Sequence, residues 1–158
     1  MSRDALNTYL NDHLAGSVGA IEMVERVIRE NEGDPFAARL TGVLAEIQAD
    51  QAVLQGLVER IGVGQSPLKK AGAWLAEKAG RVKLGGTDEP AELSRMEVLE
   101  VLAMGIQGKR ALWRALGVVA DRHAELRELD LDWLERRAAS QHEEVDAMRL
   151  EAARAALS

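Results

Sequence analysis

The chain has three histidines, 26 acidic residues and no cysteine. Metal binding or acid–base catalysis would therefore be expected to use histidines paired with carboxylates. On a helix, a carboxylate three residues before a histidine shares its face, so both can reach one metal ion. The residues at that spacing are uncharged: Leu10 before His13, Ala120 before His123 and Ala139 before His142. No Glu-x-x-His occurs, and no phosphate loop, nucleophile elbow or catalytic triad signature appears. We therefore identify no catalytic, cofactor-binding or metal-binding residue.

Each histidine has a simple structural interpretation. His13 is expected at the border of an apolar stripe, as a satisfied boundary residue rather than a ligand. His142 stands beside Glu143 and Glu144, on what is expected to be a solvated helix face. His123 is expected in the loop before the last helix.

Six polar side chains lie on or near the apolar stripes of the expected helices and form a candidate polar core cluster. They are Ser17, Gln51, Glu100, Gln107, Gln141 and Glu144. Buried polar groups need partners, so if Gln51 is buried we expect Gln141 to face it. The alternative is that each amide lies at the edge of its stripe and reaches water. Lys109, in an apolar stretch, is expected either to pair with a carboxylate of a neighbouring helix or to extend outward.

Four amphipathic helices are expected to position these residues, over residues 4–30, 35–61, 89–120 and 130–157. Apolar residues recur in them at spacings of three and four, as on one face of a helix. Gly33 suits the end of the first helix, Asp34 an N-cap and Pro35 the first turn of the second. Asp130 or Asp132 can cap the fourth helix.

A crossover of about 25 residues, 64–90, separates the second and third helices. Residues 67–84 are expected to form a short amphipathic helix that packs Leu68, Leu75 and Val82 on the bundle. The crossover is basic, with Lys69, Lys70, Lys78, Arg81 and Lys83. It is expected to cover the acidic bundle, with docking on an anionic membrane surface or partner as the alternative.

The composition places the chain among all-α proteins with one domain, residues 1–158. Helix-forming residues dominate, while Pro, Tyr and Phe are scarce. The net charge of -6 argues against a general affinity for nucleic acid. No apolar run is long enough for a membrane span, and the N-terminal residues do not resemble a secretory signal, so we expect a cytoplasmic protein.

The helix lengths and the long crossover resemble the ferritin-like superfamily over nearly the whole chain. Three strings are similar to uncharacterised bacterial ferritin-like proteins: LNTYLNDHLAG at 6–16, WLAEKAGRVKL at 74–84 and GKRALWRAL at 108–116. The resemblance implies a four-helix bundle with a short helix in the crossover. Metal-binding members hold two iron or manganese ions with one Glu from each of two helices and Glu-x-x-His from each of the others. Here Gln51 and Gln141 stand where Glu is expected, and neither helix has the His.

The leading hypothesis is therefore a non-catalytic protein with an interaction or structural role, whose di-metal site has been lost and which has no cofactor. One alternative is a metal store or oxidoreductase with iron or manganese at an atypical site. The other is a small-molecule binder that uses the bundle core.

We also expect a homodimer, because the helix at 89–120 is apolar over more than one sector. One sector contains Val98, Leu102, Leu112, Trp113 and Leu116, and another contains Met96, Ala103, Ala111 and Val118. A bundle helix needs only one buried stripe, so the second sector requires the crossover or another chain to cover it.

Overall fold

The structure is a computed structural model that describes residues 2–62 and 90–158. Those residues form helices and no β-strand, which confirms the all-helical prediction. The helices are α1 (Ser2–Glu30), α2 (Pro35–Ile61), α4 (Ala91–Val119), the 3-10 helix η1 (Ala120–Arg122), α5 (Ala124–Arg127) and α6 (Leu131–Leu157). The expected crossover helix, with Leu68, Leu75, Val82 and its basic residues, lies outside the described residues. None of the described helices is long and apolar enough to cross a membrane.

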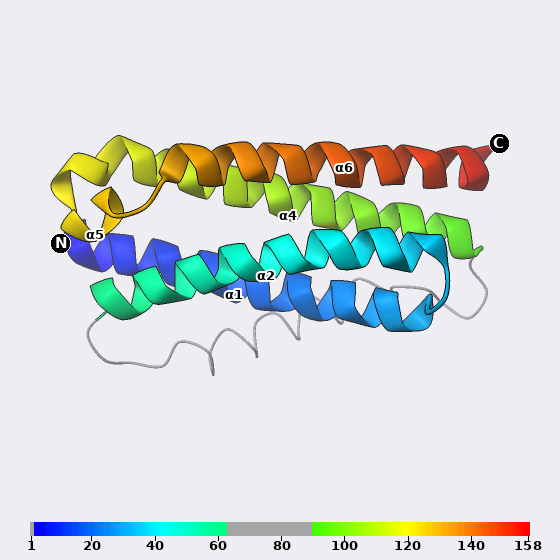
Figure 1. Cartoon of the computed structure of the whole chain (residues 1–158), viewed down its shortest axis with the longest axis horizontal. Helices are drawn as coiled ribbons and strands as arrows, with labels where there is room; N and C mark the ends of the chain where they lie inside the picture. The colour runs from blue at the N-terminus through cyan, green and yellow to red at the C-terminus, as the bar shows by residue number, and fades with distance from the viewer. Residues whose placement is uncertain (1, 63–89) are drawn as a thin grey trace.

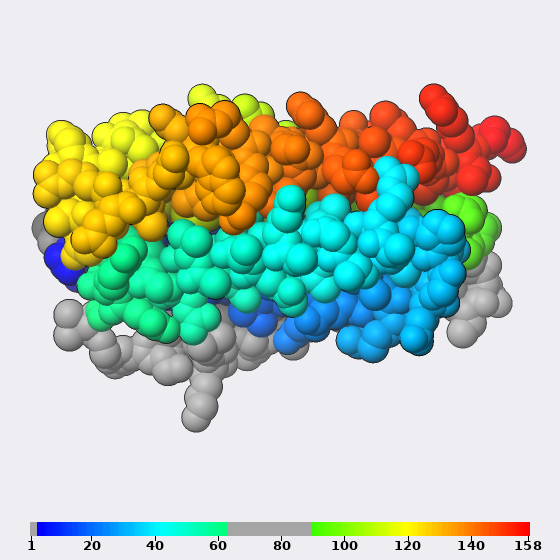
Figure 2. Space-filling view, viewed as in Figure 1, coloured from blue at the N-terminus to red at the C-terminus, as the bar shows by residue number. Residues whose placement is uncertain are grey.

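The four long helices lie side by side as two antiparallel hairpins (Figure 1). α1 packs against α2, α4 packs against α6, and α1 also contacts α4. α2 ends and α4 begins at opposite ends of the molecule, so these two helices run in the same direction (Figure 1). Figure 2 shows the face formed by α2 and α6, whose side chains meet along the length of the molecule.

The turn between α1 and α2 follows from three residues in sequence, as predicted. Gly33 has a φ of 87°, in the left-handed region that favours glycine. Asp34 is the N-cap of α2, and its carboxylate accepts a hydrogen bond of 2.8 Å from the Phe36 backbone N–H. Pro35 occupies the first helical position, where its missing N–H costs nothing.

Two other helix ends have equally local causes. Asp130, not Asp132, caps α6 by accepting a hydrogen bond of 2.9 Å from the Trp133 backbone N–H. At the end of α2, a Cβ on Gly62 would lie 2.7 Å from the Val58 carbonyl oxygen, so only glycine fits without a shift.

The core is formed by the apolar stripes of the long helices, closed at one end by Leu126 of α5. The first α4 sector, Val98, Leu102, Leu112, Trp113 and Leu116, is fully buried, as expected for a core stripe. The second sector divides. Ala103 is buried and Met96 packs partly against the core, whereas Ala111 and Val118 are exposed. Residues 2–62 and 90–158 therefore cover only part of the sector that was predicted to need the crossover or a partner.

Candidate functional site

A buried carboxylate is the centre of the polar core. Asp50 of α2 is 1% exposed, and both of its oxygens are fully engaged. Its partners are Lys109 of α4 together with Arg137 and Gln141 of α6. We call these four residues the core cluster. It joins α2, α4 and α6 at a single point, although α2 comes from one hairpin and the other two helices from the second.

The hydrogen bonds to Asp50 fill all four of its lone-pair positions. Oδ2 accepts from Lys109 Nζ at 2.6 Å and from Gln141 Nε2 at 3.0 Å. Oδ1 accepts from Arg137 Nε at 2.9 Å and also from Arg137 Nη2. Lys109 Nζ donates in addition to the Gln141 side-chain oxygen. A carboxylate has about four acceptor positions, so Asp50 has none left for a ligand.

The two cations of the core cluster are themselves largely enclosed. The side chains of Lys109 and Arg137 are 16% and 18% exposed, and the Arg137 guanidinium lies 4.1 Å from the centre of the Trp133 ring. Burial lowers the pKa of the Lys109 ammonium, the neighbouring Arg137 charge lowers it further, and the charges of Asp50 and Glu46 oppose the shift. Two cations therefore surround one buried anion.

The sequence predicted this polar level in part. Gln141 is 2% exposed and inside the core, as expected, and Lys109 takes the option of pairing with a carboxylate on a neighbouring helix. Ser17 and Gln51 meet at the edge of the core, where Gln51 Nε2 donates to Ser17 Oγ at 3.0 Å. The expectation that Gln51 faces Gln141 is wrong, because Gln141 bonds to Asp50 and Lys109 instead.

Three other members of the predicted cluster are exposed, so their inclusion is corrected. Glu100 is 57% exposed and lies 3.7 Å from Arg149. Glu144 is 46% exposed and pairs with Arg39 at 2.9 Å, while Gln107 points to solvent. The reason is helical phase, because neighbouring residues are rotated by about 100° around the axis. The inward positions belong to Leu99, Ile106 and Lys109 on α4 and to Gln141 and Val145 on α6.

No family model, curated protein or solved structure matches this chain. The roles of Asp50, Lys109 and Arg137 are therefore argued from their geometry. That geometry is a carboxylate neutralised from two sides by cations of the same chain. Such an arrangement holds helices in register and leaves no lone pair of the carboxylate for an incoming group.

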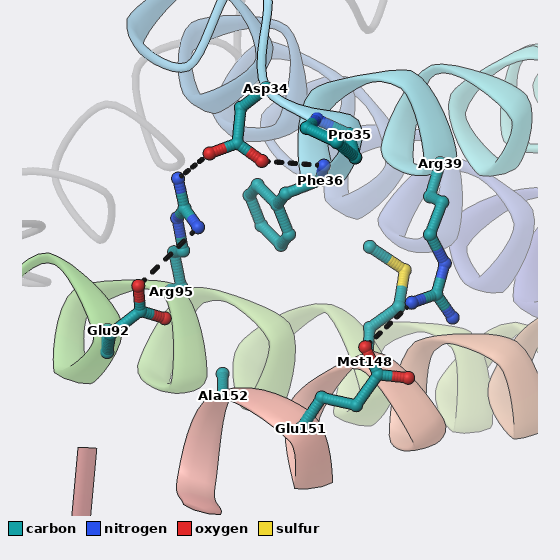
Figure 3. Close-up of a pocket in the computed structure, with 9 residues that line it drawn as sticks. All are labelled: Asp34, Pro35, Phe36, Arg39, Glu92, Arg95, Met148, Glu151 and Ala152. Atoms are coloured by element: carbon teal, nitrogen blue, oxygen red, sulfur yellow. Dashed lines mark hydrogen bonds and ion pairs between the residues drawn. The ribbon is translucent and has the colours of Figure 1, made fainter. Parts of the chain in front are cut away.

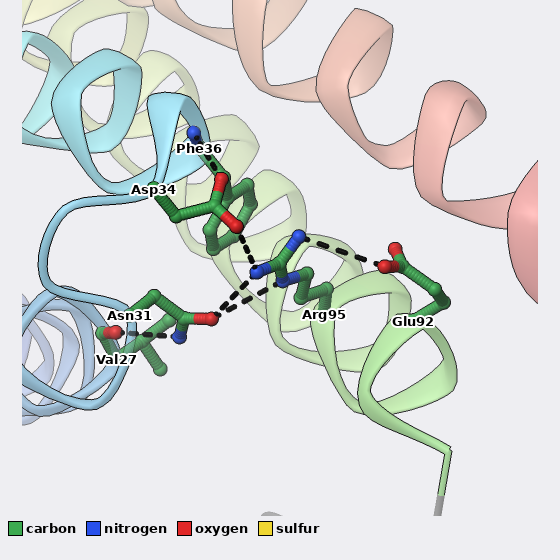
Figure 4. A network of polar contacts seen from close by, with 6 residues as sticks. All are labelled: Val27, Asn31, Asp34, Phe36, Glu92 and Arg95. Atoms are coloured by element: carbon green, nitrogen blue, oxygen red, sulfur yellow. Dashed lines mark hydrogen bonds and ion pairs between the residues drawn. The ribbon is translucent and has the colours of Figure 1, made fainter.

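A second polar network lies at the end of the molecule where α1 turns into α2. Arg95 of α4 donates to Asn31 Oδ1 at 2.8 Å and to Asp34 Oδ2 at 2.6 Å, and it lies 3.6 Å from Glu92 (Figure 4). Its guanidinium also stacks 4.7 Å from the centre of the Phe36 ring. We call Asn31, Asp34, Glu92 and Arg95 the end network, which fastens the α1–α2 turn to the start of α4.

A shallow groove of about 270 Å³ lies beside the end network (Figure 3). It is lined by Asp34, Pro35, Phe36, Arg39, Glu92, Arg95, Met148, Glu151 and Ala152. Its two guanidiniums are already paired, Arg95 with Asp34 and Arg39 with Glu151 at 2.8 Å. The groove is smaller than most small-molecule sites and offers alternating, mutually neutralised charges.

Within the described residues, none of the three histidines makes a hydrogen bond or an ion pair with a member of either network. His13 is half-buried and meets the edge of the Tyr9 ring with 4.7 Å between ring centres, and burial lowers the pKa of His13 against the opposing charge of Asp12. His123 lies between η1 and α5, in the connection where it was predicted. Within residues 2–62 and 90–158, no three His, Asp or Glu side chains gather in a way that could hold a metal ion.

The sequence analysis missed Asp50 and Arg137, although Asp50 has a recognisable signal. Three stripes with alternating steps of three and four each carry one polar residue. The α2 stripe is Leu40, Val43, Ile47, Asp50, Leu54, Leu57 and Ile61, the α4 stripe places Lys109 between Ile106 and Trp113, and the α6 stripe places Gln141 between Ala138 and Val145. A charged residue in such a stripe predicts a buried polar partner. Asp50, Lys109 and Gln141 are such partners for one another. Arg137 lies one position before the stripe and gives no comparable signal.

Proposed function

We propose that this protein is a ferritin-like four-helix bundle with a non-catalytic role in protein interaction or structure, and that it has lost the di-metal site. The observation that carries the proposal is the saturated carboxylate of Asp50 within the core cluster. At this level of the core, the positive charge comes from Lys109 and Arg137. We further propose that the protein acts in the cytoplasm and as a homodimer.

The charges of the core cluster support the loss of a metal site. Sites for iron or manganese use several carboxylates whose negative charge offsets that of the ion. Here one buried carboxylate faces an ammonium and a guanidinium, which together repel a divalent cation. Gln141, the buried polar residue of α6, contributes an amide, which cannot offset the charge of a metal ion.

Elemental analysis with a stability readout tests the proposal. The purified protein is incubated with Fe(II), Mn(II) or Zn(II), dialysed, analysed for metal and melted with and without chelator. We expect less than one metal ion per chain and an unchanged Tm. Two metal ions per chain retained through dialysis, with a Tm that falls on chelation, would favour the atypical metal site and overturn the proposal.

A matched pair of variants makes the test specific to the core cluster. Lys109→Met removes one internal cation, and Arg29→Met removes an exposed one from α1. If repulsion by the core cluster excludes metal, Lys109→Met retains more metal than the wild type does, whereas Arg29→Met retains no more than the wild type. Stoichiometric metal in the wild type that is unaffected by Lys109→Met would place a metal site elsewhere in the chain.

A further inference from the structure

The outer face of α4 carries an exposed apolar stripe. Met104 and Val118 are 66% and 82% exposed, among the largest values for apolar side chains in the described residues. Together with four further residues, they follow alternating steps of three and four along the helix. The stripe is Val101, Met104, Gly108, Ala111, Ala115 and Val118. This spacing is the a/d pattern of a helix that packs against a second helix, and it lies opposite the buried stripe of the same α4.

A line of polar side chains accompanies this stripe on one flank. Glu100, Gln107 and Arg114 are exposed and stand seven residues apart, so they lie in a row along the helix. Arg114 makes no ion pair within the described part of the chain, and Glu100 has only the 3.7 Å contact with Arg149. Along the row, the charge is negative at Glu100, neutral at Gln107 and positive at Arg114, so Gln107 is its midpoint.

We propose that this face binds a second copy of the same chain, with the two α4 helices antiparallel about a two-fold axis near Gln107. This inference rests on the homodimer proposed above and specifies its interface. Reversing the row about Gln107 places Glu100 of one copy opposite Arg114 of the other, twice. Interhelical charge pairs of this kind set partner and orientation. An isologous interface requires such self-complementarity, which a partner of different sequence would not need.

The apolar stripe has a matching order in the same register. Met104 of one copy meets Gly108 of the other, and Val101 meets Ala111, so these two larger side chains each face a small one, while Ala115 and Val118 extend beyond the paired part of the stripe. A Cβ built on Gly108 has no atom within 4 Å in this chain, so the space beside it is open. A parallel pairing is disfavoured, because it would oppose the polar row with Val98, Gly105 and Leu112. Those positions are uncharged, and Val98 and Leu112 are each 1% exposed within their own chain.

A charge exchange between two variants tests the arrangement. Glu100→Arg and Arg114→Glu are each measured alone by sedimentation equilibrium from about 1 to 500 µM, then mixed in equal amounts. Each variant alone opposes like charges twice, so we expect its dissociation constant to rise about tenfold over the wild type. The mixture restores two opposite pairs, so heterodimers return to the wild-type constant. Both substitutions are exposed, and circular dichroism checks that each variant is folded.

Cross-linking at the two-fold axis tests the position directly. The chain has no cysteine, so Gln107→Cys introduces a single thiol, and Glu143→Cys on the exposed side of α6 is the matched control. We expect a short bis-maleimide to link Gln107→Cys into a dimer much faster than Glu143→Cys.

A wild-type mass of 17.2 kDa at every concentration would overturn this inference. A dimer whose dissociation constant is the same in the wild type and in both charge variants would also overturn it. The first result would mean that the stripe is covered within one chain or by another protein, and the second that another face dimerises. Neither result bears on the proposed loss of the metal site, which is tested by elemental analysis and by thermal melts with and without chelator.

Discussion

The core cluster and the end network contain the same kinds of group but lie at different depths. Each joins an aspartate of the first hairpin to an arginine of the second, and in each the arginine also stacks on an aromatic ring. The core cluster surrounds a carboxylate that is 1% exposed, whereas the Asp34 side chain of the end network is 37% exposed. Water can therefore replace a lost partner in the end network and has little access to Asp50.

The comparison teaches that burial, rather than the number of hydrogen bonds, sets the energetic importance of each contact. Asp34 and Arg95 have as many partners as some members of the core cluster. Exposed ion pairs contribute about 0–1 kcal/mol, but a buried charge left without its partner costs about 3–5 kcal/mol. The two networks should therefore respond very differently to the same type of substitution.

The largest effect is expected for Asp50→Ala. This change leaves Lys109 and Arg137 close together without the anion that offsets both charges. We expect the free energy of unfolding to fall by about 3–5 kcal/mol, measured by urea denaturation at neutral pH. Glu59→Ala, an exposed change on the same helix, is the control and should alter stability by less than about 0.5 kcal/mol. Similar results for the two variants would mean that the core cluster is open to water.

A smaller effect is expected for Lys109→Met. Asp50 keeps Arg137 and Gln141, so the variant loses the two hydrogen bonds that Lys109 donates to Asp50 and Gln141, but no charge remains unpaired. We expect a loss of about 1–2 kcal/mol at neutral pH. A loss as large as that of Asp50→Ala would show that Lys109, rather than the carboxylate, is the centre of the core cluster.

Lys109→Met should also change the pH dependence on the alkaline side. Burial lowers the pKa of Lys109 in the folded protein below its ordinary value of 10.5. The unfolded chain then binds more protons between the two values, so wild-type stability gains from this group as pH rises toward 10.5. The variant lacks that gain. If the wild type and Lys109→Met show the same pH dependence from about pH 8 to 10, the lysine is not desolvated.

The sequence was sufficient for the helices because their causes are local. Apolar spacing, Gly33, Asp34 and Asp130 act over a few residues, and the helices found within the described ranges begin and end close to the predicted positions. The core cluster could be predicted only as a polar level. Which residue faces which depends on helix phase and on the register between hairpins, so Gln51 was chosen where its neighbour Asp50 is the inward residue. Arg137 reaches the core from beside the stripe, which no spacing rule indicates.

In the end network, Arg95→Ala tests the partly exposed counterpart of the core cluster. The change removes the bonds to Asn31 and Asp34 and the contact with Phe36, but water can reach the groups left behind. We expect a loss of about 1 kcal/mol by urea denaturation, compared with no measurable loss for the exposed Arg29→Ala. A loss near that of Asp50→Ala would remove the distinction between the two networks.

The smallest effect concerns Asp34, and it should appear on the acid side. The pKa of Asp34 is lowered by the hydrogen bond from the Phe36 backbone and then by Arg95. The ionised carboxylate therefore stabilises the fold above its ordinary value of 3.8, and this contribution disappears as pH falls through the lower folded pKa.

Asp34→Asn isolates the charge of the end network, because the amide oxygen can still accept the cap hydrogen bond from Phe36. We expect the wild type to be the more stable of the two at about pH 6, with the difference shrinking below about pH 4. Thermal melts of both proteins across this range measure it. If the difference in stability between the wild type and Asp34→Asn stays the same down to about pH 2, the contribution of Asp34 does not come from its ionised charge. In that case the stability that Asp34 contributes would come from its cap hydrogen bond and not from its charge, in contrast with the buried charge of Asp50.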